Sequence, residues 1–130
     1  MPKEVTTVSE EGFASTSTVR DFEIHLDATG EAAADTLESL LASYAACYVP
    51  ALRVGGEQRG VDELGEIEIS VTGTLNNDDK LDSISFDATV EADLDEETAN
   101  AIIDRANALC KVHDAMKPSL HADVTLHGGA

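Results

Sequence analysis

The segment 35–54, DTLESLLASYAACYVPALRV, decides how the rest of the chain folds. Its large apolar side chains share one broad stripe at 3.6 residues per turn, and most other positions are Ala or Ser. The segment is therefore predicted to be a long central helix buried on nearly every side. Asp35 and Glu38 are expected to form a capping box at its start. Pro50 is expected to kink the helix or begin its end one turn later, so that 55–65 is a glycine-rich loop.

Strands are predicted on both sides of this helix, where apolar and polar residues alternate or Val and Thr are frequent. The predicted strands are 4–10, 13–20, 21–28, 66–75, 81–91 and 119–126. In 21–28, Phe22, Ile24 and Leu26 form one apolar face, as in a half-solvated strand.

A second helix is predicted over 96–110, with a short helical turn in 111–117. Antiparallel strands separated by helices indicate the α+β class, in a single domain over residues 1–130. Because the central helix is too apolar for one small sheet to cover, a dimer is expected.

The charge and composition exclude several classes of partner. The 130 residues carry 26 acidic and 8 basic side chains, a net charge of −18. Nucleic acids and anionic membranes attract proteins with a positive field, so neither is predicted as a partner. No apolar run is long enough to span a membrane, and the N-terminus has no signal core, so a cytoplasmic location is predicted. Such an acidic surface favours a salt-rich, halophilic milieu, because salt screens the self-repulsion.

Two cysteines, Cys47 and Cys110, lie on inward faces of the predicted helices and could meet where these helices pack. They are either small packing residues, since free Cys is often buried, or a redox pair. Cys110 and His113 also have the spacing of half a zinc site, but no second pair completes four ligands. No metal and no other cofactor is therefore predicted, and His113 is expected to tune Cys110 or to cap its helix.

The remaining polar candidates have weaker signals. Glu38 is nine residues before Cys47, which places the two half a turn out of phase and roughly 13 Å apart along a helix. Glu38 is therefore expected to cap the helix, in preference to acting as an acid/base partner of Cys47. The arginines are dispersed, and the other histidines are expected to face water. These residues are Arg20, Arg53, Arg59, Arg105, His25, His121 and His127. No phosphate loop, serine elbow or H-E-x-x-H motif is present, so phosphoryl, acyl and hydride transfer have little support.

Two segments resemble a known family. Residues 37–47, LESLLASYAAC, resemble the first cysteine motif of the OsmC/Ohr family, and 109–118, LCKVHDAMKP, resemble its second motif in the generic OsmC-like branch. Lys111 stands where the family usually has Pro. The resemblance covers roughly 20–126. It implies antiparallel sheets around a long buried helix, in an intertwined homodimer with two sites at the interface.

The resemblance also implies a function, the thiol-dependent reduction of organic hydroperoxides in oxidative-stress defence. Cys47 would be the peroxidatic thiolate, Cys110 would resolve it as a disulfide, and an external dithiol would reduce the disulfide. The family also uses an N-terminal Arg held by a Glu, so Arg20 and Glu38 are supporting candidates together with His113. The alternatives are a non-catalytic dimer that binds a small apolar ligand, and a redox sensor.

Overall fold

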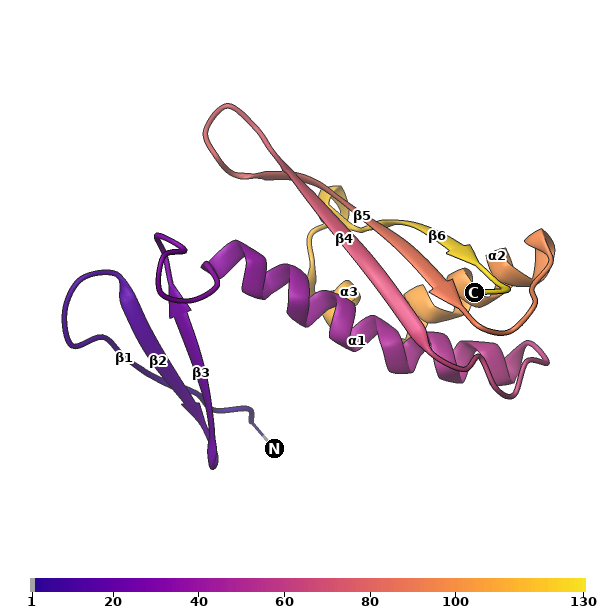
Figure 1. Cartoon of the computed structure of the whole chain (residues 1–130), viewed down its shortest axis with the longest axis horizontal. Coiled ribbons are helices and arrows are strands. Elements are labelled where there is room, and N and C mark those ends of the chain that lie inside the picture. Colours follow the sequence, from indigo (N-terminus) through magenta and orange to yellow (C-terminus); the bar gives the residue numbers. More distant parts are fainter. Residues whose placement is uncertain (1) are drawn as a thin grey trace. The chain divides into compact units, whose positions relative to one another are not determined.

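A computed structural model of the chain describes residues 2–130. It divides into two compact units, Met1–Leu40 and Leu41–Ala130. The elements in chain order, labelled in Figure 1, are β1 (Thr6–Val8), β2 (Ala14–Val19), β3 (Phe22–Asp27), α1 (Thr36–Gln58), β4 (Ile67–Leu75), β5 (Leu81–Val90), α2 (Glu96–Leu109), α3 (Lys111–Ala115), the 3-10 helix η1 (Pro118–Leu120) and β6 (Asp123–His127). That residues 1–130 form a single domain stays a prediction.

The first unit is built on an antiparallel sheet of β1, β2 and β3, in the places where the Val and Thr content and the alternation predict strands. The apolar face expected on β3 is not covered, because Phe22 is 62% exposed and Ile24 is 46% exposed. The buried side chain at the end of β3 is instead that of Asp27. Its carboxylate accepts hydrogen bonds from the backbone N–H groups of Thr29 and Ala32 and from the Thr29 hydroxyl, which compensates for its burial.

The start of α1 is as predicted. The Asp35 carboxylate accepts the Glu38 backbone N–H at 2.7 Å, and the Glu38 carboxylate accepts the Asp35 N–H at 2.9 Å. These two bonds satisfy amides that the first helical turn leaves free, so the expected capping box is confirmed.

The predicted end of this helix is wrong, because α1 continues past Pro50 to Gln58. Gly55 and Gly56, assigned from sequence to a loop, are buried helical residues. A Cβ atom on Gly55 would lie 3.2 Å from the Ile102 carbonyl oxygen of α2. The glycines therefore let the end of α1 pack closely against its neighbours, and they do not break the helix.

The prediction that α1 is buried on nearly every side is also wrong within the chain. Its buried side chains after Leu41 lie on one face, which includes Tyr44, Tyr48 and Leu52. The opposite face is open, with Val54 41% exposed. The single sheet of this unit offers one apolar face, which α1 shares with α2, so no layer covers the far side of α1.

The second unit contains the sheet β4–β5–β6, with α1 running along the β4–β5 hairpin (Figure 1). The hairpin is antiparallel as predicted, but β6 pairs with β5 in parallel, which corrects the expectation of antiparallel pairs throughout. A crossover through α2, α3 and η1 returns the chain to the same end of the sheet, which makes a parallel pair. The core lies between this sheet and the two long helices. The rings of Tyr44 and Tyr48 pack edge-on against the Phe86 ring of β5, with ring centroids 4.7 and 5.2 Å apart respectively.

Candidate functional site

The structure brings the two cysteine thiols together within the unit Leu41–Ala130. Cys47 lies on α1, and Cys110 occupies the break between α2 and α3. Cys110 has an extended backbone (φ −74°, ψ 113°), so α2 ends there, and its Sγ caps α3 by accepting the His113 N–H at 3.4 Å. The two thiols lie within hydrogen-bonding reach of each other and are both free. Cys110 is 1% exposed, whereas Cys47 is half-buried.

The surroundings of the two thiols shift their pKa values in opposite directions. Burial raises the pKa of Cys47, but hydrogen bonds from the Val112 and Lys111 backbone N–H groups and from the Cys110 thiol, together with the Lys111 charge, outweigh it and place that pKa below its usual range. Burial raises the pKa of Cys110, and the adjacent Cys47 raises it further. Cys47 is therefore the thiol that ionises first, with Cys110 as its protonated neighbour.

A small apolar hollow opens beside Cys47. Its volume is about 280 Å³, and its lining residues are Cys47, Pro50, Ala51, Val54, Leu109 and Lys111. Lys111 is the charged residue in this lining, and no carboxylate contributes to it. The ionisable thiol is thus accessible from a surface suited to an apolar molecule.

A polar cluster includes His113, whose backbone N–H bonds the Cys110 sulfur, and the sequence did not reveal this cluster. The Tyr44 hydroxyl accepts the Ala122 backbone N–H at 3.0 Å and lies 2.5 Å from Nδ1 of His113. The His113 ring stacks on His121, with centroids 3.9 Å apart. Burial lowers the pKa of His113, and the charge on His121 lowers it further, so His113 is a neutral acceptor for the Tyr44 proton at neutral pH. From the sequence, Tyr44 is interpreted as a core residue, because its hydrogen-bond partners are about 70 to 80 residues away along the chain.

The other two supporting candidates belong to the unit Met1–Leu40 and have contacts there. Arg20 lies in the turn between β2 and β3 with φ 54°, and its guanidinium is 5.1 Å from the centroid of the Phe22 ring. Glu38 forms the capping box described above. Of the predicted site residues, the structure therefore groups Cys47, Cys110 and His113.

Comparison with known proteins identifies the family. Residues 28–125 match the family described as OsmC-like protein. The chain belongs to the OsmC-like family. An uncharacterized protein from Haloferax volcanii is 45% identical over 127 residues, which cover 98% of this chain and 96% of that protein.

Solved structures share the fold of this OsmC-like protein. An OsmC-like protein from Mycoplasma pneumoniae has a TM-score of 0.82 at 21% identity, and the match covers 98% of each chain. The organic hydroperoxide resistance protein OhrB of Bacillus subtilis has a TM-score of 0.69 at 24% identity, again over 98% of each chain. The α+β OsmC-like fold expected from the two cysteine motifs is confirmed, with the corrections to α1 and β6 given above.

Cys110 and His113, which have the spacing of half a zinc site, have other partners in this OsmC-like protein. The His113 backbone N–H bonds the Cys110 sulfur, while Nδ1 of its ring contacts Tyr44. Within residues 2–130, no three His, Cys, Asp or Glu side chains are grouped so that they could hold a metal ion. Across the same residues, no helix has both the length and the apolar character needed to cross a bilayer.

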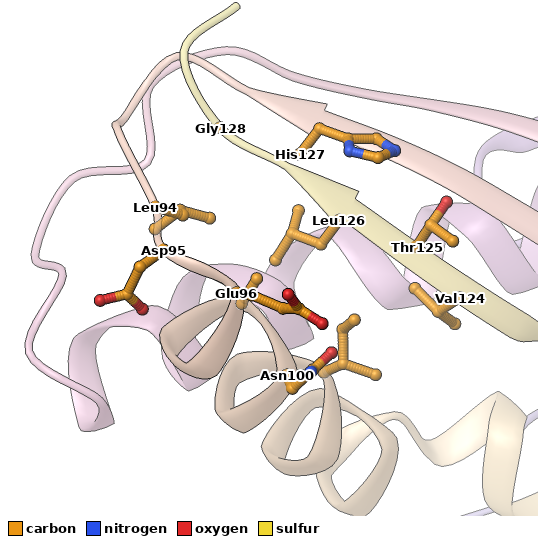
Figure 2. Close-up of a pocket in the computed structure, with 11 residues that line it drawn as sticks. Leu94, Asp95, Glu96, Asn100, Val124, Thr125, Leu126, His127 and Gly128 are labelled. Carbon is orange, nitrogen blue, oxygen red and sulfur yellow. The ribbon is translucent and has the colours of Figure 1, made fainter.

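A second hollow, of about 530 Å³, lies between the start of α2 and β6 (Figure 2). Its polar lining includes Asp95, Asn100 and His127, and neither cysteine contributes to it. Asp95 is engaged as the cap of α2, where its carboxylate accepts the Thr98 N–H at 2.7 Å. His127 is exposed and lies 3.3 Å from Asp87. This hollow has no thiol in its lining, so the site with a redox-active side chain is the one at Cys47.

Proposed function

We propose that this OsmC-like protein is a thiol-dependent peroxidase that reduces organic hydroperoxides through a Cys47/Cys110 dithiol–disulfide cycle. The observation that carries the proposal is the contact between two free thiols whose pKa values are shifted apart. A peroxidase of this kind needs one ionised, accessible sulfur and one protonated sulfur beside it. Cys47, whose pKa is lowered and whose side chain is half-buried, is suited to the first role, and Cys110, whose pKa is raised, is suited to the second.

The cycle has three steps. The Cys47 thiolate attacks the distal peroxide oxygen, the O–O bond breaks, and the alkoxide takes a proton to leave as an alcohol, which leaves Cys47 as a sulfenic acid. The Cys110 thiol then gives up its proton, its sulfur attacks the Cys47 sulfur, and water is released as the disulfide forms. An external dithiol reduces this disulfide by two successive exchanges and is itself oxidised to a disulfide.

The apolar hollow supports an organic substrate. Its lining is aliphatic apart from Cys47 and Lys111, so burial of an alkyl chain is favoured there, whereas hydrogen peroxide gains nothing from such a surface. The names of relatives such as the organic hydroperoxide resistance protein OhrB support the same substrate class.

The functional form is proposed to be a homodimer in the cytoplasm. Large apolar side chains remain exposed in each unit, and exposed apolar surface favours association. These residues are Val5, Val8, Phe13, Phe22, Ile24, Val54 and Leu75. Arg20 and Glu38 remain supporting candidates in this assembly, while Glu38 already has a structural role as a cap.

The same hollow also favours a second candidate function, the binding of a small apolar ligand without catalysis. In that case Cys47 and Cys110 would be packing residues. A third arrangement, a redox sensor, would form the disulfide without efficient recycling.

The deciding experiment adds one equivalent of an organic hydroperoxide per subunit to the reduced protein in high salt, followed by thiol counting and intact mass. The peroxidase is expected to lose both thiols and two mass units within a subunit, and to turn over with an external dithiol. Cys47→Ser is expected to abolish consumption, and Cys110→Ser to stop after one event per site with Cys47 as a sulfenic acid.

Three other results would contradict the peroxidase. Two unreacted thiols would favour the ligand-binding protein, and a co-purifying apolar molecule would support it. Complete oxidation without turnover would favour the sensor. Turnover in both serine variants at the wild-type rate would refute the proposed cycle.

A further inference from the structure

The side chain of Lys111 lies at the reactive sulfur. Lys111 is the first residue of α3, and its backbone N–H donates a hydrogen bond to Cys47. Its side chain lines the same apolar hollow as Cys47. The Lys111 side chain is exposed to solvent, but its place in this lining keeps its charge on the same side of the thiol as the hollow.

Lys111 is a positive charge beside the thiol in a protein whose other charges are mostly negative. The chain has a net charge of −18, which opposes the formation of another anion. No carboxylate lines the hollow at Cys47. Across residues 2–130 the ion pair within 4 Å is that of His127 with Asp87, so the ammonium of Lys111 is not neutralised by a carboxylate.

The other titratable groups around the thiol do not supply a positive charge. Cys110 is buried and in contact with Cys47. Beyond Cys110 lie Tyr44 and His113, which share a hydrogen bond and are neutral at neutral pH. Lys111 is therefore the cation that faces Cys47 in this unit.

We propose that the Lys111 ammonium is the electrostatic activator of Cys47, holding it as a thiolate. The inference rests on the proposed function in taking Cys47 as the reactive sulfur. It concerns ionisation of the thiol before any peroxide binds, so it can be tested without a peroxidase assay. An opposite charge within a few ångströms favours the ionised form, and salt weakens the effect because this side chain is exposed.

The test measures the pH dependence of Cys47 alkylation by iodoacetamide in the fully reduced protein, with the modified peptide identified by mass. Lys111→Gln keeps the backbone N–H and removes the charge, and the thiolate fraction at neutral pH is expected to fall about three- to tenfold. Lys111→Arg is expected to retain the wild-type profile. Lys80→Gln, in the exposed β4–β5 turn, makes the same change in net charge away from the thiol and is the matched control.

A second comparison varies the salt. The difference between Lys111→Gln and Lys80→Gln is expected to shrink as ionic strength rises. Equal alkylation profiles for these two variants at low salt would overturn the role of Lys111, as would failure of Lys111→Arg to restore the profile. A shifted profile in a protein that consumes no hydroperoxide would instead leave Lys111 as the activator and refute the peroxidase.

Discussion

Tyr44→Phe tests the polar cluster that joins α1 to the segment before β6. The substitution removes one oxygen from a side chain that is fully buried. The ring is retained, so its edge-on contact with Phe86 at 4.7 Å is expected to persist. The hydroxyl has two partners, the Ala122 backbone N–H and Nδ1 of His113, and both lose it at once.

The expected cost follows from these two partners. An unpaired donor or acceptor that is removed from water costs roughly 1–3 kcal/mol, and both partners here are half-buried and not fully enclosed. We therefore expect the free energy of unfolding to fall by about 2 kcal/mol, which lowers the folded-to-unfolded ratio roughly 30-fold.

Tyr48→Phe is the matched control. Tyr48 is equally buried and also packs edge-on against Phe86. Its hydroxyl donates one hydrogen bond, to Asn107 at 2.8 Å, and loss of that single bond is expected to cost about 1 kcal/mol.

The assay is urea unfolding at constant high KCl, followed by circular dichroism. The slope m should be the same in the two variants, since neither changes the surface exposed on unfolding. A Tyr44→Phe variant that is no less stable than Tyr48→Phe would refute the reasoning, because the one additional partner of the Tyr44 hydroxyl would then contribute no energy.

The remaining predictions concern pH and salt. Burial lowers the pKa of His113 below its usual 6.5 in the folded protein. Between the folded pKa and 6.5 the unfolded chain therefore binds more protons than the folded one. The free energy of unfolding is expected to fall as the pH drops through this range. Burial is the larger cause of the lowered pKa, so His121→Asn, which removes the neighbouring charge, should flatten this dependence in part in urea titrations at several pH values, whereas an unchanged slope would exclude a contribution from the His113–His121 repulsion. Stability should also rise with KCl, because the net charge of −18 is self-repelling and the Debye length shortens from about 10 Å at 0.1 M to about 3 Å at 1 M. Equal urea midpoints at these two salt concentrations would contradict this effect of the acidic surface.

Local sequence signals determined several elements of this protein. The Asp35–Glu38 spacing predicted a capping box because such a box involves four consecutive residues, and the structure contains both of its bonds. The period-two alternation predicted the β4–β5 hairpin, and the two cysteine motifs predicted the OsmC-like fold. Each of these properties depends on neighbours along the chain or on a pattern preserved in the sequence.

Other features were decided by the tertiary structure. Gly55 lies inside α1, where a Cβ would be 3.2 Å from the Ile102 carbonyl oxygen of α2, and no local signal reports that neighbour. Phe22 lies on an apolar strand face that the chain leaves uncovered, because periodicity identifies a face and not the layer that covers it.

The site itself combines both kinds of information. The sequence predicted two inward-facing thiols, and it placed Lys111 directly after Cys110, but the structure has Cys110 at the break between two helices and not on a helical face. Only the packing of α1 beside the break at Cys110 brought the sulfurs together and directed the Lys111 and Val112 amides to Cys47. Ionisation of a thiol depends on the charges and hydrogen-bond donors within a few ångströms of it, and those distances are set by the folded chain.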